Sequence, residues 1–132
     1  MKINKKVLVV VAHRDDEVLG CGGTIAKLVD ENYKVYAISM TDGVSSRDHY
    51  TKKELADRLK NSLKASKILG FKWLKKISGN FSDNSMDSEP LLKIVKVIEK
   101  AKKIVNPEIV ITHFPEDINI DHQIVSTATL TA

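Results

Sequence analysis

Two short segments of this 132-residue chain concentrate imidazole and carboxylate side chains. Residues 12–17 read AHRDDE, and residues 113–122 read HFPEDINIDH. Each segment directly follows an apolar run, residues 7–11 in the first case and residues 109–111 in the second. Histidine and carboxylate groups that converge from separate parts of a chain are common ligands of zinc. The two segments therefore indicate one polar, metal-binding site, provided that the fold brings them together.

In the first segment, His13 and Asp16 are spaced closely enough to bind one ion within a tight turn. The neighbouring carboxylates of Asp15 and Asp16 cannot both point at that ion in the same way. One of them can be a ligand while the other faces the water whose pKa the ion lowers. The alternative is structural, because Asp15 and Asp16 would also suit the cap of a helix, with Glu17 in its first turn.

In the second segment, His122 can supply a third protein ligand, which leaves one zinc position open for water and substrate. Asp121 has two possible roles: it can orient an imidazole ring, or it can cap the last helix. A single histidine after a strand is more often a surface residue than a ligand. Two such clusters at the ends of two strands favour the metal site.

The elements that must position these residues alternate between strand and helix. A parallel sheet gathers the carboxyl ends of its strands at one edge, so the two clusters would face each other across one cleft. The alternation predicts a mainly parallel sheet with helices on both faces, an α/β fold. We predict strands over residues 6–12, 34–40, 71–77 and 108–112; a helix after a loop loosened by Gly20, Gly22 and Gly23; a helix from the capping box of Thr51 and Glu54 to Gly70; a helix capped by Ser88 with Pro90 in its first turn; and a helix from about Asp121.

Composition allows one domain, since 132 residues with 42% hydrophobic content can bury one core. The net charge of +4 comes from lysines spread along helical segments, without the interleaved aromatic residues or arginines of a nucleic-acid surface. We therefore expect no nucleic-acid partner. The single cysteine, Cys21, suits a reducing cytoplasm. The sequence shows neither a secretory apolar segment nor a run of about 18 apolar residues, so we expect a cytoplasmic protein without a membrane span.

At these motifs the sequence resembles the PIG-L/LmbE-like family of zinc-dependent N-deacetylases. The resemblance covers the whole chain, from residues 12–17 through Thr41-Asp42-Gly43 to the DxNxDH pattern of residues 117–122. It implies a Rossmann-like three-layer sandwich that removes acetyl groups from N-acetylated sugars such as N-acetylglucosamine conjugates. It also implies that His13, Asp16 and His122 bind Zn²⁺ and that Asp15 is the general base. Asp15 would take a proton from the attacking water, while the metal and a nearby donor hold the oxyanion.

The chain departs from the family pattern in three respects. The family usually has proline where this chain has Arg14, so the turn that carries the ligands loses a stiffening ring. It often has histidine where this chain has Asn119, which can donate a hydrogen bond to the oxyanion but cannot shuttle a proton. The chain is also shorter than family members. We therefore interpret residues 1–132 as a single, incomplete deacetylase domain, whose open sheet edge could promote association into a homo-oligomer.

Three alternative functions belong to other classes. A receiver domain would match the acidic pair after the first strand, but it needs a phosphoacceptor aspartate where residues 77–80 read ISGN. A dinucleotide-binding half-domain would match the glycines, but the GxGxxG spacing is missing. A non-catalytic remnant of the deacetylase fold is the strongest alternative, and only turnover would separate it from an enzyme.

Overall fold

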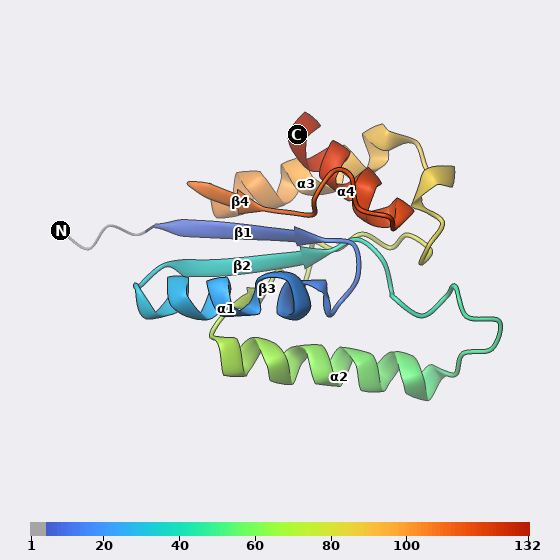
Figure 1. Cartoon of the computed structure of the whole chain (residues 1–132), viewed down its shortest axis with the longest axis horizontal. Coiled ribbons are helices and arrows are strands. Elements are labelled where there is room, and N and C mark those ends of the chain that lie inside the picture. The colour runs from blue at the N-terminus through green and yellow to red at the C-terminus, as the bar shows by residue number, and fades with distance from the viewer. Residues whose placement is uncertain (1–4) are drawn as a thin grey trace.

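The structure is a computed structural model that describes residues 5–132 (Figure 1). Strands and helices alternate along the chain, with one short 3₁₀ helix between the third strand and the third α-helix. The elements are β1 (Lys6–Val11), α1 (Asp16–Asp30), β2 (Lys34–Ser39), α2 (Lys52–Leu69), β3 (Lys72–Trp73), the 3₁₀ helix η1 (Met86–Ser88), α3 (Leu91–Val105), β4 (Ile109–Ile111) and α4 (Ile120–Thr131).

The four strands form one parallel sheet in the order β3-β2-β1-β4. β1 lies in the interior of the sheet, where Val9 is in register with Ala37 of β2 on one side and with Ile111 of β4 on the other. Because β1 and β4 run side by side in the same direction, the segments that follow them leave the sheet at the same edge. This arrangement confirms the predicted α/β class and brings the two polar segments together.

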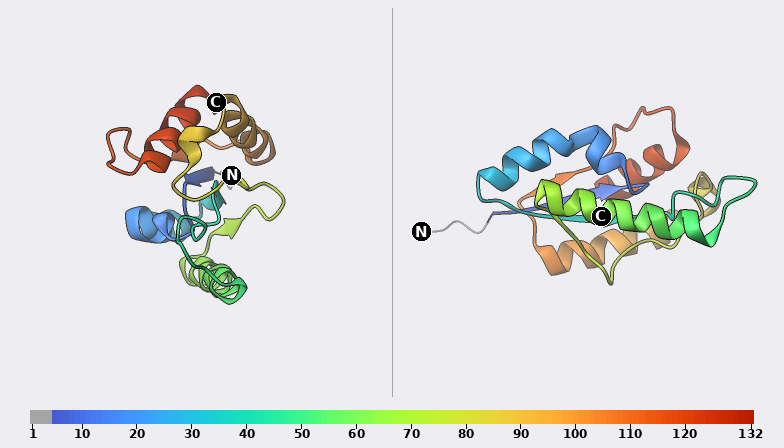
Figure 2. Two further views of the ribbon diagram at one scale, coloured as in Figure 1. Left: turned by 90° about the vertical axis from the view of Figure 1, so that its right-hand side faces the viewer. Right: turned by 90° about the horizontal axis from the view of Figure 1, so that it is seen from below.

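The helices cover both faces of the sheet and enclose two cores. Figure 1 shows α3 and α4 above the strands and α1 and α2 below them, and the end-on view of Figure 2 separates the same layers. Side chains of β1 alternate between the two faces, as a pleated strand requires. Leu8 and Val10 pack with α3 and α4, whereas Val7 and Val9 pack with Ile25 of α1. All four β1 side chains are fully buried, so the strand that precedes the first polar segment is fixed from both sides.

The predicted start and end of α2 are confirmed. The Thr51 hydroxyl accepts a hydrogen bond from the backbone N–H of Glu54, and the Glu54 side chain accepts one from the backbone of Thr51. This reciprocal pair is the capping box read from the sequence. At the other end, Gly70 has φ of 81°, a left-handed conformation that favours glycine.

Three sequence predictions about these elements are wrong. The three glycines do not loosen a loop before the first helix, because α1 already begins at Asp16 and includes them. Their effect is instead local: Cys21, between Gly20 and Gly22, has non-helical dihedral angles at a kink in α1. The third strand is only Lys72–Trp73 rather than residues 71–77, because the chain turns after it, where the Ile77 N–H donates to the Leu74 carbonyl.

The start of α3 is the third correction. Ser88 does not cap this helix, because it lies in η1 and its hydroxyl donates to the carbonyl of Ser85. Pro90 occupies the cap position rather than the first turn, and α3 begins at Leu91. The apolar spacing within α3 buries Ile94 and Ile98 fully, whereas Leu91 at its start is 37% exposed. Apolar periodicity thus located the helix but not its first residue.

The outer edge of β4 carries no further strand among residues 5–132. Ile109 and Val110 are 39% and 38% exposed, although an interior parallel strand would bury both faces. The expectation that such an edge promotes association stays a prediction. Within the described residues we find no helix with the length and apolar character needed to span a bilayer.

Gly70 offers a test of how α2 ends. A Cβ atom added there would lie 2.7 Å from Val29 Cγ1, which is too close for a van der Waals contact. The left-handed backbone at Gly70 is also unfavourable for any residue with a Cβ atom. We expect Gly70→Ala to lower the free energy of unfolding by about 1–2 kcal/mol or more, measured by urea denaturation. The matched control is Gly23→Ala within α1, where an added Cβ meets nothing within 4 Å. That variant should stabilise the protein by roughly 1 kcal/mol because alanine is the better helix former. Equal effects of the two substitutions would contradict this account.

Candidate functional site

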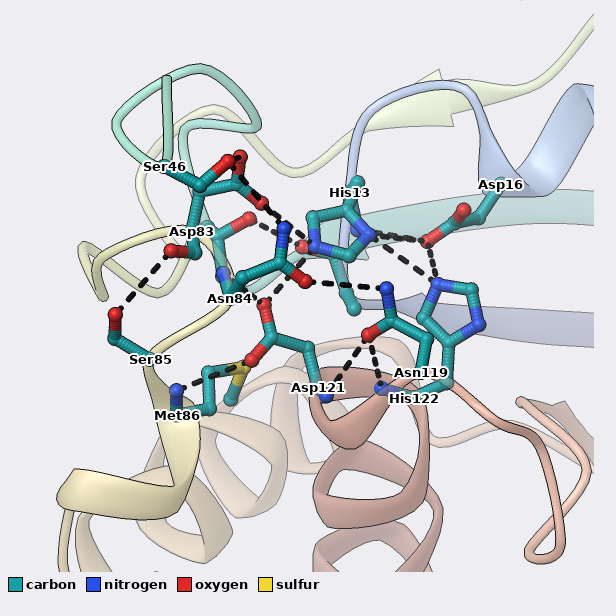
Figure 3. Close-up of polar contacts among 12 residues, drawn as sticks. His13, Asp16, Ser46, Asp83, Asn84, Ser85, Met86, Asn119, Asp121 and His122 are labelled. Carbon is teal, nitrogen blue, oxygen red and sulfur yellow. Dashed lines mark hydrogen bonds and ion pairs between the residues drawn. The ribbon is translucent and has the colours of Figure 1, made fainter. Parts of the chain in front are cut away.

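The polar site forms where β1 and β4 end. His13 follows β1 and His113 follows β4, and the first turn of α4 brings His122 back toward them. The N-termini of α1 and α4 both lie here, so the positive ends of their helix dipoles favour the acidic residues gathered around the site. Figure 3 shows His13, from the turn after β1, close to Asp16 of α1, to Asp121 and His122 of α4, and to Asp83 from the segment before η1.

Three side-chain atoms face one another at the centre of the site. His13 Nδ1 lies 3.2 Å from His122 Nε2 and 3.3 Å from Asp16 Oδ2, and His122 Nε2 lies 3.3 Å from the same Asp16 oxygen. A tetrahedral ion at 2.0–2.1 Å from each ligand needs ligand atoms about 3.3–3.4 Å apart. The three atoms therefore form one face of a tetrahedron of the size that zinc requires.

The outward nitrogen of each of these two histidines meets a carboxylate. His13 Nε2 lies 3.0 Å from Asp121 Oδ2 and 2.9 Å from Asp83 Oδ1. His122 Nδ1 lies 3.1 Å from Asp117 Oδ2. A carboxylate in this position holds the ring proton on the outward nitrogen, which leaves the inward nitrogen free to bind a metal. The arrangement of both rings thus matches that of metal-binding histidines.

Asp121 is the most firmly held of these carboxylates. It is fully buried, and its two oxygens accept hydrogen bonds from the backbone N–H groups of Asn84, at 2.6 Å, and Met86, at 3.1 Å. Burial alone would raise the pKa of Asp121, but hydrogen bonds from His13 and these two N–H groups lower it. Asp121 therefore stays an anion and can accept the proton of His13 Nε2.

The same contacts act on His13. Burial disfavours the charged ring, but the hydrogen bonds with Asp121 and Asp16 outweigh it and raise the pKa of His13 to about 10. Burial would likewise raise the pKa of Asp16, yet its hydrogen bonds with the His13 side chain and backbone lower it. The centre of the site thus strongly favours positive charge, either a proton on His13 or a bound cation.

His113, which the sequence analysis placed in the second segment without a role, has a defined position. Its Nε2 accepts a hydrogen bond from the Ala12 N–H at 2.9 Å, and its ring stacks on His122 with centroids 3.9 Å apart and an interplanar angle of 13°. Burial and the neighbouring His122 lower the pKa of His113 to about 4. His113 is therefore a neutral ring that supports His122.

Asp15 lies at the edge of the same site. It occupies the N-cap position of α1, but its side chain makes no capping hydrogen bond, contrary to the structural alternative. Its Oδ2 accepts instead from Arg58 of α2 at 2.8 Å. Asp15 lines a cavity of about 390 Å³ together with His13, Asp16 and His122. Of the two adjacent carboxylates, Asp16 thus faces the two imidazoles, and Asp15 faces the open cavity.

Asn119 has a structural role that the sequence analysis did not assign to it. Its Oδ1 accepts hydrogen bonds from the backbone N–H groups of Asp121 and His122, so Asn119, and not Asp121, caps α4. Its Nδ2 donates to Asn84 Oδ1 at 3.2 Å. Asn119 also lines the cavity.

Sequence reasoning missed Asp83, Arg58 and a role for Asp117. Asp83 lies in the irregular segment before η1, where no periodicity or motif marks it, and only tertiary structure brings it to His13. Arg58 lies among several charged residues of α2, and no motif marks it. Asp117 stands five residues before His122 within the second polar segment, and its presence there was the one signal that could have been used.

Comparison with known proteins finds relatives that are described as deacetylases. The chain is 31% identical over 144 residues to a probable N-acetyl-alpha-D-glucosaminyl L-malate deacetylase 2 of Bacillus cereus, across 98% of this chain and 61% of that protein. Its structure superposes on N,N'-diacetylchitobiose deacetylase of Pyrococcus horikoshii with a TM-score of 0.72 and 28% identity, across 98% of this chain and 49% of that one. The chain thus spans about half of one of these relatives and about three fifths of the other.

A further likeness concerns the fold alone. GalB of Pseudomonas putida, a 4-carboxy-2-hydroxymuconate hydratase, superposes with a TM-score of 0.80 at 24% identity, across 96% of this chain and 55% of that protein. The fold therefore accommodates reactions other than deacetylation, and function must be argued from the site. Residues 8–132 match the sequence profile of the family described as PIG-L, GlcNAc-PI de-N-acetylase. Because this match covers nearly the whole chain, the protein belongs to the PIG-L family.

Proposed function

We propose that this chain is the metal-binding part of a zinc-dependent deacetylase that acts on an N-acetylated amino sugar. The observation that carries the proposal is the pair of histidines, His13 and His122, each with a carboxylate on its outward nitrogen and its inward nitrogen directed at Asp16. Family membership and the named relatives supply the reaction class.

The donor set fits zinc. Two imidazole nitrogens and one carboxylate oxygen are ligands that zinc accepts, and three protein ligands leave a fourth position open, as catalytic zinc sites require. A second group of possible ligands comprises His13, Asp83 and Asp121. We favour the group with Asp16 and His122, because the Asp121 oxygens are already occupied by backbone N–H groups. His122, Asp16 and His13 also line the open cavity.

The relatives point to the substrate class. One relative is named for a glucosaminyl malate conjugate and another for diacetylchitobiose, and both names describe an acetamido group on a glucosamine unit. The cavity next to the three ligands measures about 390 Å³, within the range of small-molecule sites. We therefore assign the cavity to the acetamido sugar.

The residues of the cavity can divide the chemistry of amide hydrolysis. A zinc ion held by the three ligands would polarise the acetamide carbonyl and make the attacking water more acidic. Asp15, held by Arg58 at the cavity wall, accepts the proton of that water as general base. Asn119 Nδ2, at the rim of the same cavity, donates a hydrogen bond to the oxyanion. Asp15 then holds the proton that the leaving amine requires, so the products are acetate and a free amino sugar.

Asp121 gives a first test, because it positions His13 without facing the ion. We expect Asp121→Asn to weaken Zn²⁺ affinity by about 10- to 100-fold, as loss of a hydrogen-bonding partner of a metal-bound histidine does elsewhere. Chelator competition measures the affinity. Asp87→Asn, an exposed carboxylate of η1, is the control and should leave the affinity unchanged. Wild-type affinity in Asp121→Asn would remove Asp121 from the metal site.

Asp15 gives the second test, because it separates metal binding from chemistry. Asp15→Asn should retain zinc and slow acetate release by about 10²-fold or more through loss of the general base. The assay follows acetate release from N-acetylglucosaminyl malate and from diacetylchitobiose. If Asp15→Asn loses zinc while Asp16→Asn retains it, the assignment of the two carboxylates is reversed. If the zinc-loaded wild type releases acetate from neither substrate class, the proposed reaction is wrong.

A further inference from the structure

Arg14 stands between the proposed ligand His13 and the proposed base Asp15, and its partly buried side chain extends away from the ligands toward Trp73 and α2. Its guanidinium carbon lies 4.4 Å from the centre of the Trp73 ring, and its NH1 donates to Ser62 Oγ at 3.3 Å. We propose that Arg14 is a positioning residue that holds the metal-binding turn against Trp73 and α2. The inference rests on the proposed metal site.

The aromatic partner of Arg14 is itself fixed. Trp73 is only 7% exposed, and it packs edge-on against Phe71 with ring centroids 5.4 Å apart. Its indole N–H donates to the backbone carbonyl of Ser62 at 3.3 Å. The hydroxyl of the same serine accepts the hydrogen bond from Arg14. A guanidinium stacked on a buried, hydrogen-bonded ring has little freedom, so the contact can transmit order to the backbone at position 14.

α2 holds two successive residues of the turn. Arg58 and Ser62 are one helical turn apart on its inner side, and they bind Asp15 and Arg14 respectively. These two turn residues are the ones that separate His13 from Asp16. The spacing of the proposed ligands therefore depends on a helix that supplies no ligand.

The backbone of the turn is hydrogen-bonded on either side of Arg14 but not at Arg14 itself. The N–H groups of Asp15 and Asp16 both donate to the His13 carbonyl, at 3.1 and 3.3 Å, and the His13 N–H donates to Asp16 Oδ2 at 2.8 Å. Within residues 5–132, no backbone hydrogen bond of this turn involves Arg14. A ring at this position would restrict the backbone before the metal binds, and arginine does not. Contacts of the Arg14 side chain can provide the restriction that the backbone lacks.

A buried carboxylate lies near Arg14 along the chain. Glu17 is fully buried in α1, and neither of its carboxylate oxygens has a hydrogen-bond partner within residues 5–132. Arg14 and Glu17 line one cavity of about 410 Å³ between α1 and α2. The cation of Arg14 therefore lies on the same cavity wall as this carboxylate, while its guanidinium contacts Trp73 and Ser62.

The test is a double-substitution cycle on Zn²⁺ affinity, measured by chelator competition. Arg14→Ala should weaken the affinity by about 3- to 30-fold, the range expected for a partly buried cation–π contact. Trp73→Leu should weaken it similarly in the wild type, and it should have no further effect once Arg14 is alanine. The cycle subtracts any general destabilisation by Trp73→Leu, because that effect is common to both backgrounds. Lys100→Ala on α3, an exposed cation remote from the site, should leave the affinity unchanged.

Two further variants distinguish an effect of restricting the backbone at position 14 from an effect of the positive charge there. Arg14→Lys keeps the charge but not the planar stacking group, so it should behave like Arg14→Ala. Arg14→Pro restricts the backbone by its ring and should recover most of the affinity without any dependence on Trp73. Additive effects of Arg14→Ala and Trp73→Leu, or an Arg14→Pro variant as weak as Arg14→Ala, would overturn the inference.

A measurement without metal keeps the two proposals distinct. Trp73 is the only tryptophan, so fluorescence of the folded, metal-free protein reports its contact with Arg14 directly. Arg14→Ala should change the emission, and Lys100→Ala should not. A wild type that binds no zinc contradicts the proposed function and this inference with it. A wild type that binds zinc, with no coupling between Arg14 and Trp73, contradicts this inference alone.

Discussion

The contact between His13 Nε2 and the buried carboxylate of Asp121 is the interaction on which the site depends. It joins the turn after β1 to the first turn of α4, and the backbone of Asn84 and Met86 fixes the carboxylate from a third segment. An anion buried this deeply is costly unless charged and hydrogen-bonding partners surround it. Asp121 has both, and as a result the other nitrogen of His13 can face only Asp16 and His122.

The parallel pairing of β1 and β4 makes that contact possible. The two strands are adjacent although more than ninety residues separate them in the sequence, and their carboxyl ends deliver His13 and His113 to one edge. Apolar side chains on both faces of β1 hold the strand rigidly beneath its polar turn. The same edge gathers ligands and substrates in other open α/β sheets. The fold thus supplies position, and a few charged side chains supply chemistry.

Local patterns in the sequence predicted most of the elements, and tertiary contacts account for the rest. Apolar runs located β1 and β4, and the Thr51 capping box located α2. These features depend only on residues that are close together in the sequence. The glycines of α1 led to the wrong prediction of a loop, because burial and packing can override the low helix propensity of glycine. Two motifs marked His13, His122 and the Asp15–Asp16 pair as candidates, and the family resemblance favoured Asp16 of the two carboxylates. Asp83 was missed because it reaches His13 from an irregular segment that no local pattern marks.

The central claim is that one metal ion binds between His13 Nδ1, Asp16 Oδ2 and His122 Nε2. The most direct measurement is anomalous scattering at the zinc absorption edge from crystals of this chain grown with Zn²⁺. Our account predicts a single peak about 2.0–2.2 Å from each of those three atoms, with His13 Nε2 still on Asp121. A peak on the opposite side of the His13 ring, between Asp83 and Asp121, or no peak near His13 at all, would contradict it.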